Sequence, residues 1–224
     1  MRIEILTLFP DMFAPLHQSM IGRAENAGIV SIHEEDIRLH TKDRHFKCDD
    51  VPYGGGAGMV MTPQPIVDCV RALDPENKAR RIFMSPRGRT LNSGIARELA
   101  EEEFIMLLCG HYEGVDQRAL DICGFEELSI GDYVLTGGEL AAMVTVDALL
   151  RFVPGVLGCG DSAEEESFSD GLLEYPQYTR PAIFEGQAVP DVLLSGHHEN
   201  IAKWRKAKAE EITAERRPDL KKCR

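Results

Sequence analysis

Strand-like and helix-like runs of residues alternate along the first two thirds of the chain. Runs of β-branched and apolar residues predict five strands, at 2–9, 28–36, 81–86, 104–110 and 126–131. Apolar residues at helical spacing predict five helices, at 12–24, 62–73, 92–103, 115–123 and 138–152. Pro86 is expected to end the third strand. Repeated β–α units predict an α/β fold, with a mostly parallel sheet and helices on both of its faces.

The composition changes after the last of these helices. Residues 158–181 mix Gly, Ser, Pro and acidic residues with little periodicity, which is typical of a linker or a lid. Beyond them, residues 197–217 are a helix candidate with Trp204 as its apolar anchor. We therefore expect an α/β domain at 1–157, a flexible linker or lid at 158–175, and a small helical domain at 176–224.

Charge is distributed unevenly along the chain. The formal net charge of −12 argues against a nucleic-acid partner. The segment 197–224 nevertheless contains nine Lys and Arg against five Asp and Glu, so it is net positive. Such asymmetry suggests a basic arm that reaches toward an anionic polymer. A solvated helix of mixed charge explains the same pattern equally well.

The chain has the character of a cytoplasmic protein. Its apolar runs fall short of the roughly 18 residues that a membrane span needs, and the N-terminal segment lacks the layout of a signal peptide. The six cysteines occur singly, without a C-x-x-C pair or metal-ligand spacing. We expect reduced thiols that mostly pack in the core. Cys109 ends an apolar run, and packing is preferred there over a catalytic thiol.

Three glycine-, proline- or aromatic-rich loops follow predicted strands, at 85–89, 109–114 and 129–138. Ligands of parallel sheets bind beyond the carboxyl ends of the strands, so these loops are the expected binding region. A fourth glycine-rich stretch, YGGGAGM at 53–59, lacks both the G-K-[ST] ending and the preceding strand of a phosphate loop. It is more typical of a flexible loop that shapes a binding surface.

The stretch SIGDYVLTGGEL at 129–140 is the most specific of these loops. Gly137 and Gly138 stand at the mouth of a predicted helix, without a nearby lysine to hold a phosphate. Glu139 in the first turn of that helix would repel a phosphate. Main-chain N–H and C=O groups can instead pair with the edge of an adenine, which offers a donor and an acceptor and no charge. The loop therefore predicts a site for a neutral base.

Several motifs occur together in a fixed order: LFPDMF, VPYGGGAGMVM, SPRGR, CGHYEGVDQR, SIGDYVLTGGELAAM, RFVPGVLG, SAEEESFSDGLLEYPQYTRP and LLSGHHENIAKWR. In this order the chain resembles the bacterial tRNA (guanine-N1)-methyltransferase family, the TrmD type. The resemblance covers most of residues 6–205.

The resemblance implies a fold, a reaction and partners. The α/β domain would be of the SPOUT class, with a C-terminal trefoil knot formed by the three strand-end loops. The enzyme would use S-adenosylmethionine to methylate N1 of the guanosine at position 37 of tRNA, in the anticodon arm. It would act as a homodimer with its active site at the interface, and its activity would depend on Mg²⁺ at an unknown site.

The resemblance also implies roles for individual residues. The donor would contact ten residues of the three loops: Pro86, Gly110, Ile130, Gly131, Asp132, Tyr133, Val134, Leu135, Gly137 and Gly138. N1 of guanine holds a proton at neutral pH, so the reaction needs a base, and Asp170 matches the family's general base. Arg151 would stabilise negative charge on guanine O6, and Glu113 would bind the guanine edge. His111 receives no role.

Two other functions remain open at this point. A ribose 2′-O-methyltransferase would share the fold and the donor but modify a different atom of RNA. A non-catalytic RNA-binding module would not bind S-adenosylmethionine at all. The loop at 129–138 is the feature that argues against the second alternative.

Overall fold

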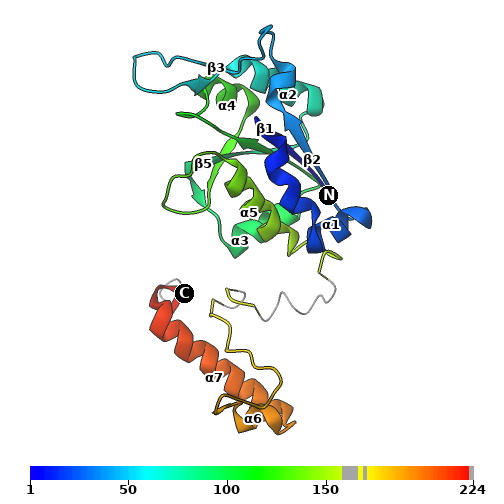
Figure 1. The fold of residues 1–224 in the computed structure, drawn as a ribbon, viewed down its shortest axis with the longest axis vertical. Helices are drawn as coiled ribbons and strands as arrows, with labels where there is room; N and C mark the ends of the chain where they lie inside the picture. The colour runs from blue at the N-terminus through cyan, green and yellow to red at the C-terminus, as the bar shows by residue number, and fades with distance from the viewer. Residues whose placement is uncertain (158–165, 169–170, 222–224) are drawn as a thin grey trace. The chain divides into compact units, whose positions relative to one another are not determined.

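The computed structural model describes residues 1–157, 166–168 and 171–221. The chain divides into two compact units, Met1–Gly158 and Cys159–Arg224, of which the first contains the main sheet and the second a long helix (Figure 1). The domain boundaries expected from the sequence stay a prediction, and residues 158–165 and 169–170 of the proposed lid lie outside the described residues.

The first unit is built on a five-stranded sheet in which every pair of neighbours is parallel. Its strand order is β2-β1-β6-β5-β7. The strands are β1 (Arg2–Thr7), β2 (Ser31–Asp36), β5 (Arg80–Thr90), β6 (Phe104–Cys109) and β7 (Glu126–Ser129). The prediction of a mostly parallel sheet is thus confirmed, whereas the trefoil knot stays a prediction.

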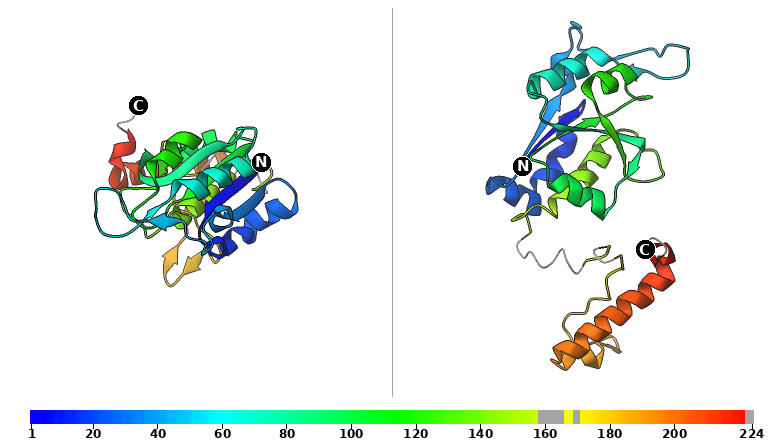
Figure 2. Two further views of the ribbon diagram at one scale, coloured as in Figure 1. Left: turned by 90° about the horizontal axis from the view of Figure 1, so that it is seen from above. Right: turned by 180° about the vertical axis from the view of Figure 1, so that it is seen from behind.

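Helices cover both faces of this sheet, as predicted (Figures 1 and 2). On one face, Ile3 and Ile5 of β1 pack in a hydrophobic cluster together with apolar side chains of the 3₁₀ helix η1 and of helices α1, α3 and α5. On the other face, Leu6 and Met106 pack in a second cluster with α2 and α4. The helices are η1 (Pro10–His17), α1 (Ser19–Asn26), α2 (Pro63–Leu73), α3 (Ser93–Ala100), α4 (Gln117–Cys123) and α5 (Glu139–Leu150).

Two local predictions are wrong. Pro86 does not end β5, because residues 85–88 leave the ladder with β7 between Met84 and Arg89, so the missing N–H costs no ladder bond. The single helix expected at 12–24 is divided into η1 and α1. The break lies at Ser19, whose φ of 55° is left-handed.

The second unit contains the predicted C-terminal helix, α7 (His198–Arg216). A short helix α6 (Asp191–Leu194), a hairpin of β8 (Ile183–Phe184) and β9 (Gln187–Ala188), and the 3₁₀ helix η4 (Pro218–Lys221) accompany it. Trp204 packs near Tyr178, with ring centroids 6.3 Å apart, so it anchors α7 as expected. Thr213 is fully buried on α7 and accepts a hydrogen bond of 2.8 Å from the N–H of Leu173.

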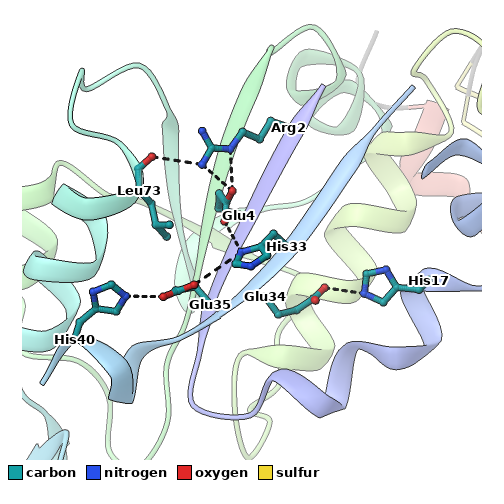
Figure 3. A network of polar contacts seen from close by, with 8 residues as sticks. All are labelled: Arg2, Glu4, His17, His33, Glu34, Glu35, His40 and Leu73. Carbon is teal, nitrogen blue, oxygen red and sulfur yellow. Dashed lines mark hydrogen bonds and ion pairs between the residues drawn. The ribbon is translucent and has the colours of Figure 1, made fainter. Parts of the chain in front are cut away.

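Charged side chains line the edge strand β2 and its neighbour β1 (Figure 3). The buried carboxylate of Glu4 accepts hydrogen bonds from Arg2 Nε at 2.8 Å and pairs with His33 Nδ1 at 2.9 Å. Glu35 pairs with His40 Nε2 at 2.6 Å. Ion pairs along an edge strand disfavour its pairing with another chain, so this network protects the open side of the sheet.

The same network predicts a pH-dependent contribution to stability from His17. Its ring nitrogens lie 2.8 Å from Glu25 and 3.0 Å from Glu34. Partial burial lowers the pKa of His17, but the hydrogen bonds and charges of the two glutamates outweigh it and raise the pKa above 6.5. The stabilisation is therefore complete below pH 6.5 and is lost as the pH rises through the raised pKa.

We expect His17→Gln to lower the free energy of unfolding at pH 6 by about 0.5 kcal/mol, since solvent screens this half-exposed group. The loss should be smaller at pH 8.5, as measured by urea denaturation at both values. His45→Gln, which changes an exposed histidine without a carboxylate partner in the described part of the chain, is the control. An equal loss at the two pH values would contradict this account.

Candidate functional site

The three predicted loops meet at one edge of the sheet. They follow β5, β6 and β7, which are neighbours in the sheet, so their carboxyl ends lie together. A cavity of about 190 Å³ opens there. Its described lining comprises Phe83, Met84, Ser85, Pro86, Gly110, His111, Tyr112, Glu113, Gly114, Leu128, Ser129, Ile130, Gly131, Tyr133, Val134, Leu135, Thr136, Gly137, Gly138 and Ala141.

The cavity brings together most of the residues expected to bind the donor. Nine of the ten line it, and Asp132 is the exception. Glu113, expected to bind the guanine edge, lines the same cavity. The structure therefore brings these residues together at one site, whereas their roles toward a ligand stay a proposal.

Short-range hydrogen bonds shape the loop that precedes α5. Ser129 Oγ contacts both the N–H and the C=O of Gly131, and the N–H of Tyr133 donates to Gly131 O at 3.0 Å. The four N–H groups from Val134 to Gly137 find no acceptor within the described parts of the chain. Main-chain donors are thus available at the cavity wall, as a neutral base would require.

Gly138 marks a close approach between two of the loops. Its N–H donates a hydrogen bond of 2.9 Å to the carbonyl of Gly110. A Cβ at position 138 would lie 2.7 Å from Cys109 Cα and 2.9 Å from Gly110 N, both of them main-chain atoms. Because main-chain atoms cannot move aside as a flexible side chain can, only glycine fits at this crossing.

A buried polar group lies behind this crossing, and the sequence did not reveal it. The carboxylate of Glu139 is 1% exposed. Thr7 Oγ1 donates to it at 2.7 Å, and His111 Nε2 lies 2.8 Å from its second oxygen. His111, which received no role from the sequence, therefore belongs to the cavity wall. The local hint was that a charged residue opens a mostly apolar helix.

The glycine-rich loop at 53–59 lies beside the same site. Two short antiparallel strands that were not predicted, β3 (Asp49–Asp50) and β4 (Val60–Met61), flank this loop. The N–H of Glu113 donates to Met59 O at 2.9 Å, and the N–H of Met61 donates to Gly114 O at 2.9 Å. These bonds join the loop region to the turn that carries Glu113, which supports a role in shaping a binding surface.

The cysteines in the described part of the chain pack in the core, as expected. Cys48, Cys69, Cys109 and Cys123 are buried, while Cys159 and Cys223 lie outside the described residues. Cys109 is 0% exposed, and its burial, together with the charge of Glu139, raises the pKa of its thiol. A protonated, buried thiol is a poor nucleophile, so the geometry supports packing over catalysis.

Of the two residues expected to act on guanine, the structure describes only Arg151, and Arg151 does not line this cavity. Arg151 follows the C-terminal end of α5, and the cavity adjoins the beginning of that helix. A helix of 12 residues spans about 18 Å. Arg151 lines a different hollow, of about 600 Å³, between α5 and the segment of η1 and α1. Asp170 lies outside the described residues, so its prediction stays open.

Among the described residues, no group of three or more His, Cys, Asp and Glu side chains is arranged to hold a metal ion. None of the helices in this part of the chain combines the length and the apolar character that a membrane span requires.

The sequence matches one family over nearly its whole length. A sequence profile described as tRNA (Guanine-1)-methyltransferase TrmD matches residues 1–223. A tRNA (guanine-N(1)-)-methyltransferase of Clostridium botulinum strain Hall is 59% identical over 220 residues, which cover 98% of this chain and 91% of the relative. An enzyme of the same name from Clostridium perfringens strain SM101 is 56% identical over 220 residues, covering 98% and 93%.

The crossing at Gly138 makes a direct prediction about the cavity. Gly138→Ala forces main-chain atoms apart, and overpacking of this kind costs roughly 1–3 kcal/mol. We expect S-adenosylmethionine to bind about 5- to 100-fold more weakly to this variant by isothermal titration calorimetry. The control is Gly94→Ala in α3, where the nearest atom to an added methyl is a side-chain oxygen of Asn92 at 3.1 Å. Unchanged affinity in Gly138→Ala would show that the crossing does not shape the donor site.

Proposed function

The chain belongs to the TrmD family of tRNA (guanine-N1)-methyltransferases, and from this premise we propose that it methylates N1 of the guanosine at position 37 of tRNA. Members of this family use S-adenosylmethionine as methyl donor. The observation that carries the proposal is the cavity at the ends of β5, β6 and β7, where nine of the ten expected donor-binding residues meet.

The residues at the cavity fit this donor. The open N–H groups from Val134 to Gly137 suit the edge of an adenine, which is polar but uncharged. The described lining contains no Lys or Arg, which a phosphate-bearing nucleotide would favour. Apolar side chains of Ile130, Leu135 and Ala141 offer surfaces for the flat base. S-adenosylmethionine supplies an electrophilic methyl group when it is bound.

The remaining chemistry is the removal of a proton. N1 of guanine is a poor nucleophile until its proton leaves, so we assign the carboxylate of Asp170 as the base that accepts this proton. The lone pair released on N1 then takes the methyl group, and the donor leaves as a neutral thioether. Arg151 stabilises the charge that develops on guanine O6, and Glu113 binds the guanine edge.

The segment beside Asp170 is held on the second unit. The N–H of Phe168 donates to Leu172 O at 2.7 Å, and the N–H of Leu173 donates to Thr213 on α7. An unperturbed Asp, with a pKa of about 3.9, is a weak base for this reaction, so the bound RNA must help to position it. The base thus belongs to the unit that we propose grips tRNA.

We propose that a second copy of the chain completes the site. Within one chain, Arg151 lies at the far end of α5 from the donor cavity. Leu140 and Val144 of α5 are 50% and 48% exposed, and the exposed Asp147 follows them on the same face of the helix. Exposed apolar side chains that gather on one face mark an interaction site, so Leu140 and Val144 call for a partner surface. The hollow of about 600 Å³ beside Val144 and Arg151 offers space for that partner.

tRNA is the proposed macromolecular partner of α7. Five of the ten Lys and Arg residues of the second unit lie on this helix. Lys203 and Lys208 are paired with glutamates of the same helix, whereas Lys206 is exposed and forms no ion pair among the described residues. Such cations contact phosphates and position RNA without reading its sequence.

Two further points of the proposal are how Mg²⁺ is held and in which compartment the enzyme works. Mg²⁺ usually keeps several waters and binds through one or two carboxylates together with a phosphate-bearing substrate. We therefore propose that the Mg²⁺ on which activity depends is held jointly with the RNA.

Because tRNA is its substrate, we propose that the enzyme works in the cytoplasm.

The assignment of the base and the target atom is tested by methyl transfer from labelled S-adenosylmethionine. We expect methylation of a tRNA transcript with guanosine at position 37, and none when adenosine replaces it. Asp170→Asn should abolish turnover and Arg151→Ala should lower kcat about a hundredfold or more. Donor affinity by calorimetry should stay near that of the unmodified chain for both variants. Asp191→Asn, an exposed aspartate of α6, is the matched control.

Normal turnover by Asp170→Asn would refute the proposed base. Nuclease digestion and mass spectrometry of the product separate N1 of guanine from a ribose 2′-oxygen, so a 2′-O-methyl product would favour the rival enzyme. A chain that binds no S-adenosylmethionine would instead favour the non-catalytic module.

The dimer is tested by placing charge on the exposed face of α5. We expect Val144→Glu to shift the chain from dimer to monomer in analytical ultracentrifugation, because an apolar interface does not bury an unpaired charge. Loss of methyl transfer should accompany this shift. The control is Ile122→Glu on α4, which is 61% exposed on the opposite side of the sheet. A monomeric unmodified chain with full activity would contradict the shared site.

A further inference from the structure

The buried group formed by Thr7, Glu139 and His111 has no part in the chemistry assigned above. It joins three segments distant in sequence: the end of β1, the loop after β6 and the first residue of α5. Glu139 Oε1 accepts from Thr7 Oγ1 at 2.7 Å, and Glu139 Oε2 lies 2.8 Å from His111 Nε2. Both carboxylate oxygens are therefore engaged.

Only main chain separates this carboxylate from the cavity. Gly137 and His111 line the cavity. A Cβ at Gly137 would lie 2.5 Å from Glu139 Oε2 and 2.5 Å from His111 Nε2. The glycine backbone thus packs directly on the hydrogen-bonded pair, so the charge of Glu139 lies immediately behind the cavity wall.

The negative charge of Glu139 has little local compensation. Its one ion-pair partner among the described residues is His111, and no Lys or Arg belongs to the described lining. Arg38 is the nearby arginine, but it stacks on Phe9 and pairs with Asp36. In the tautomer that carries the proton on Nε2, a neutral imidazole donates to Glu139 Oε2, and the pair then has a net negative charge.

The other described groups near His111 carry no positive charge that would offset the negative charge of Glu139. Phe9 packs against the imidazole with a centroid distance of 4.6 Å, and Tyr112 lies 6.1 Å away. Glu113 on the same turn adds a further carboxyl group to the lining. Burial raises the pKa of the Cys109 thiol, and the charge of Glu139 raises it further. The charge of Glu139 therefore also acts at the C-terminal end of β6.

We propose that the Thr7–Glu139–His111 group makes the cavity selective for the cationic sulfonium donor over its neutral thioether product, S-adenosylhomocysteine. This inference rests on the proposed function, because it concerns the same cavity. The two ligands differ in one methyl group and one positive charge at sulfur. A buried negative charge, screened little by solvent, attracts the first more than the second.

The selectivity has a consequence for turnover. The transfer of the methyl group removes the positive charge from sulfur, and with it the attraction to Glu139. The product is then bound more weakly than the donor that must replace it. Thr7 and His111 are positioning residues in this scheme, because their hydrogen bonds fix the carboxylate behind Gly137.

Calorimetric titration of the full-length chain with each ligand tests the proposal. We expect Glu139→Gln, which keeps the shape of the side chain, to weaken S-adenosylmethionine binding by about fivefold or more. S-adenosylhomocysteine should change by less than about twofold. Glu101→Gln, which removes an equal charge from the exposed surface away from the cavity, should leave both affinities unchanged.

A second variant tests the charge without removing the carboxylate. His111→Lys places a fixed positive charge next to Glu139, so the preference for the sulfonium should fall in the same direction. This variant keeps the proposal testable if Glu139→Gln fails to fold, which thermal unfolding would reveal.

The outcomes separate this inference from the proposed function. An equal loss of affinity for both ligands in Glu139→Gln would show a purely structural role and overturn the inference. Unchanged affinity for both would overturn it as well. If the unmodified chain binds neither ligand, the proposed function itself fails.

Discussion

The main-chain contact between Gly138 and Gly110 is the constraint on which the site depends. The N–H of Gly138 reaches the carbonyl of Gly110 at 2.9 Å, and a Cβ at position 138 would collide with the main chain at the end of β6. This contact fixes the start of α5 against a buried strand. The loop from Ile130 to Gly137 then lines the cavity beside it, and its N–H groups from Val134 to Gly137 have no acceptor within the described parts of the chain.

The same contact explains why a carboxylate is buried beside the cavity. Because α5 begins so close to β6, its first side chain, Glu139, is directed into the interior between Thr7 and His111. The helix then carries the chain to Arg151, one helix length from the cavity. The first unit thus supplies the proposed donor site at one end of α5 and the proposed guanine-stabilising arginine at the other. A site shared between two copies reconciles these positions.

The sequence predicted the cavity well because the cavity follows from local patterns. Strands rich in β-branched residues, joined by helices, must be parallel, and the loops after parallel strands meet at one edge of the sheet. The glycines at 137 and 138 then mark where the main chain is exposed. The effect of Pro86 was predicted wrongly because it depends on whether that part of β5 is paired, which no local pattern shows.

Contacts between segments that are distant in the sequence could not be predicted from the sequence. Thr7 and Glu139 are 132 residues apart and meet only because β1 and β6 are neighbours in the sheet. The strand order β2-β1-β6-β5-β7 is likewise a result of tertiary packing. The resemblance to a family supplied roles for Arg151 and Asp170 that neither spacing nor periodicity could give.

A crystal structure of the chain with S-adenosylmethionine bound is the most direct test of the central claim. The account predicts that the edge of the adenine pairs with main-chain N–H and C=O groups between Ile130 and Gly138. An empty cavity with the donor bound elsewhere, or an adenine held there by side chains alone, would contradict it.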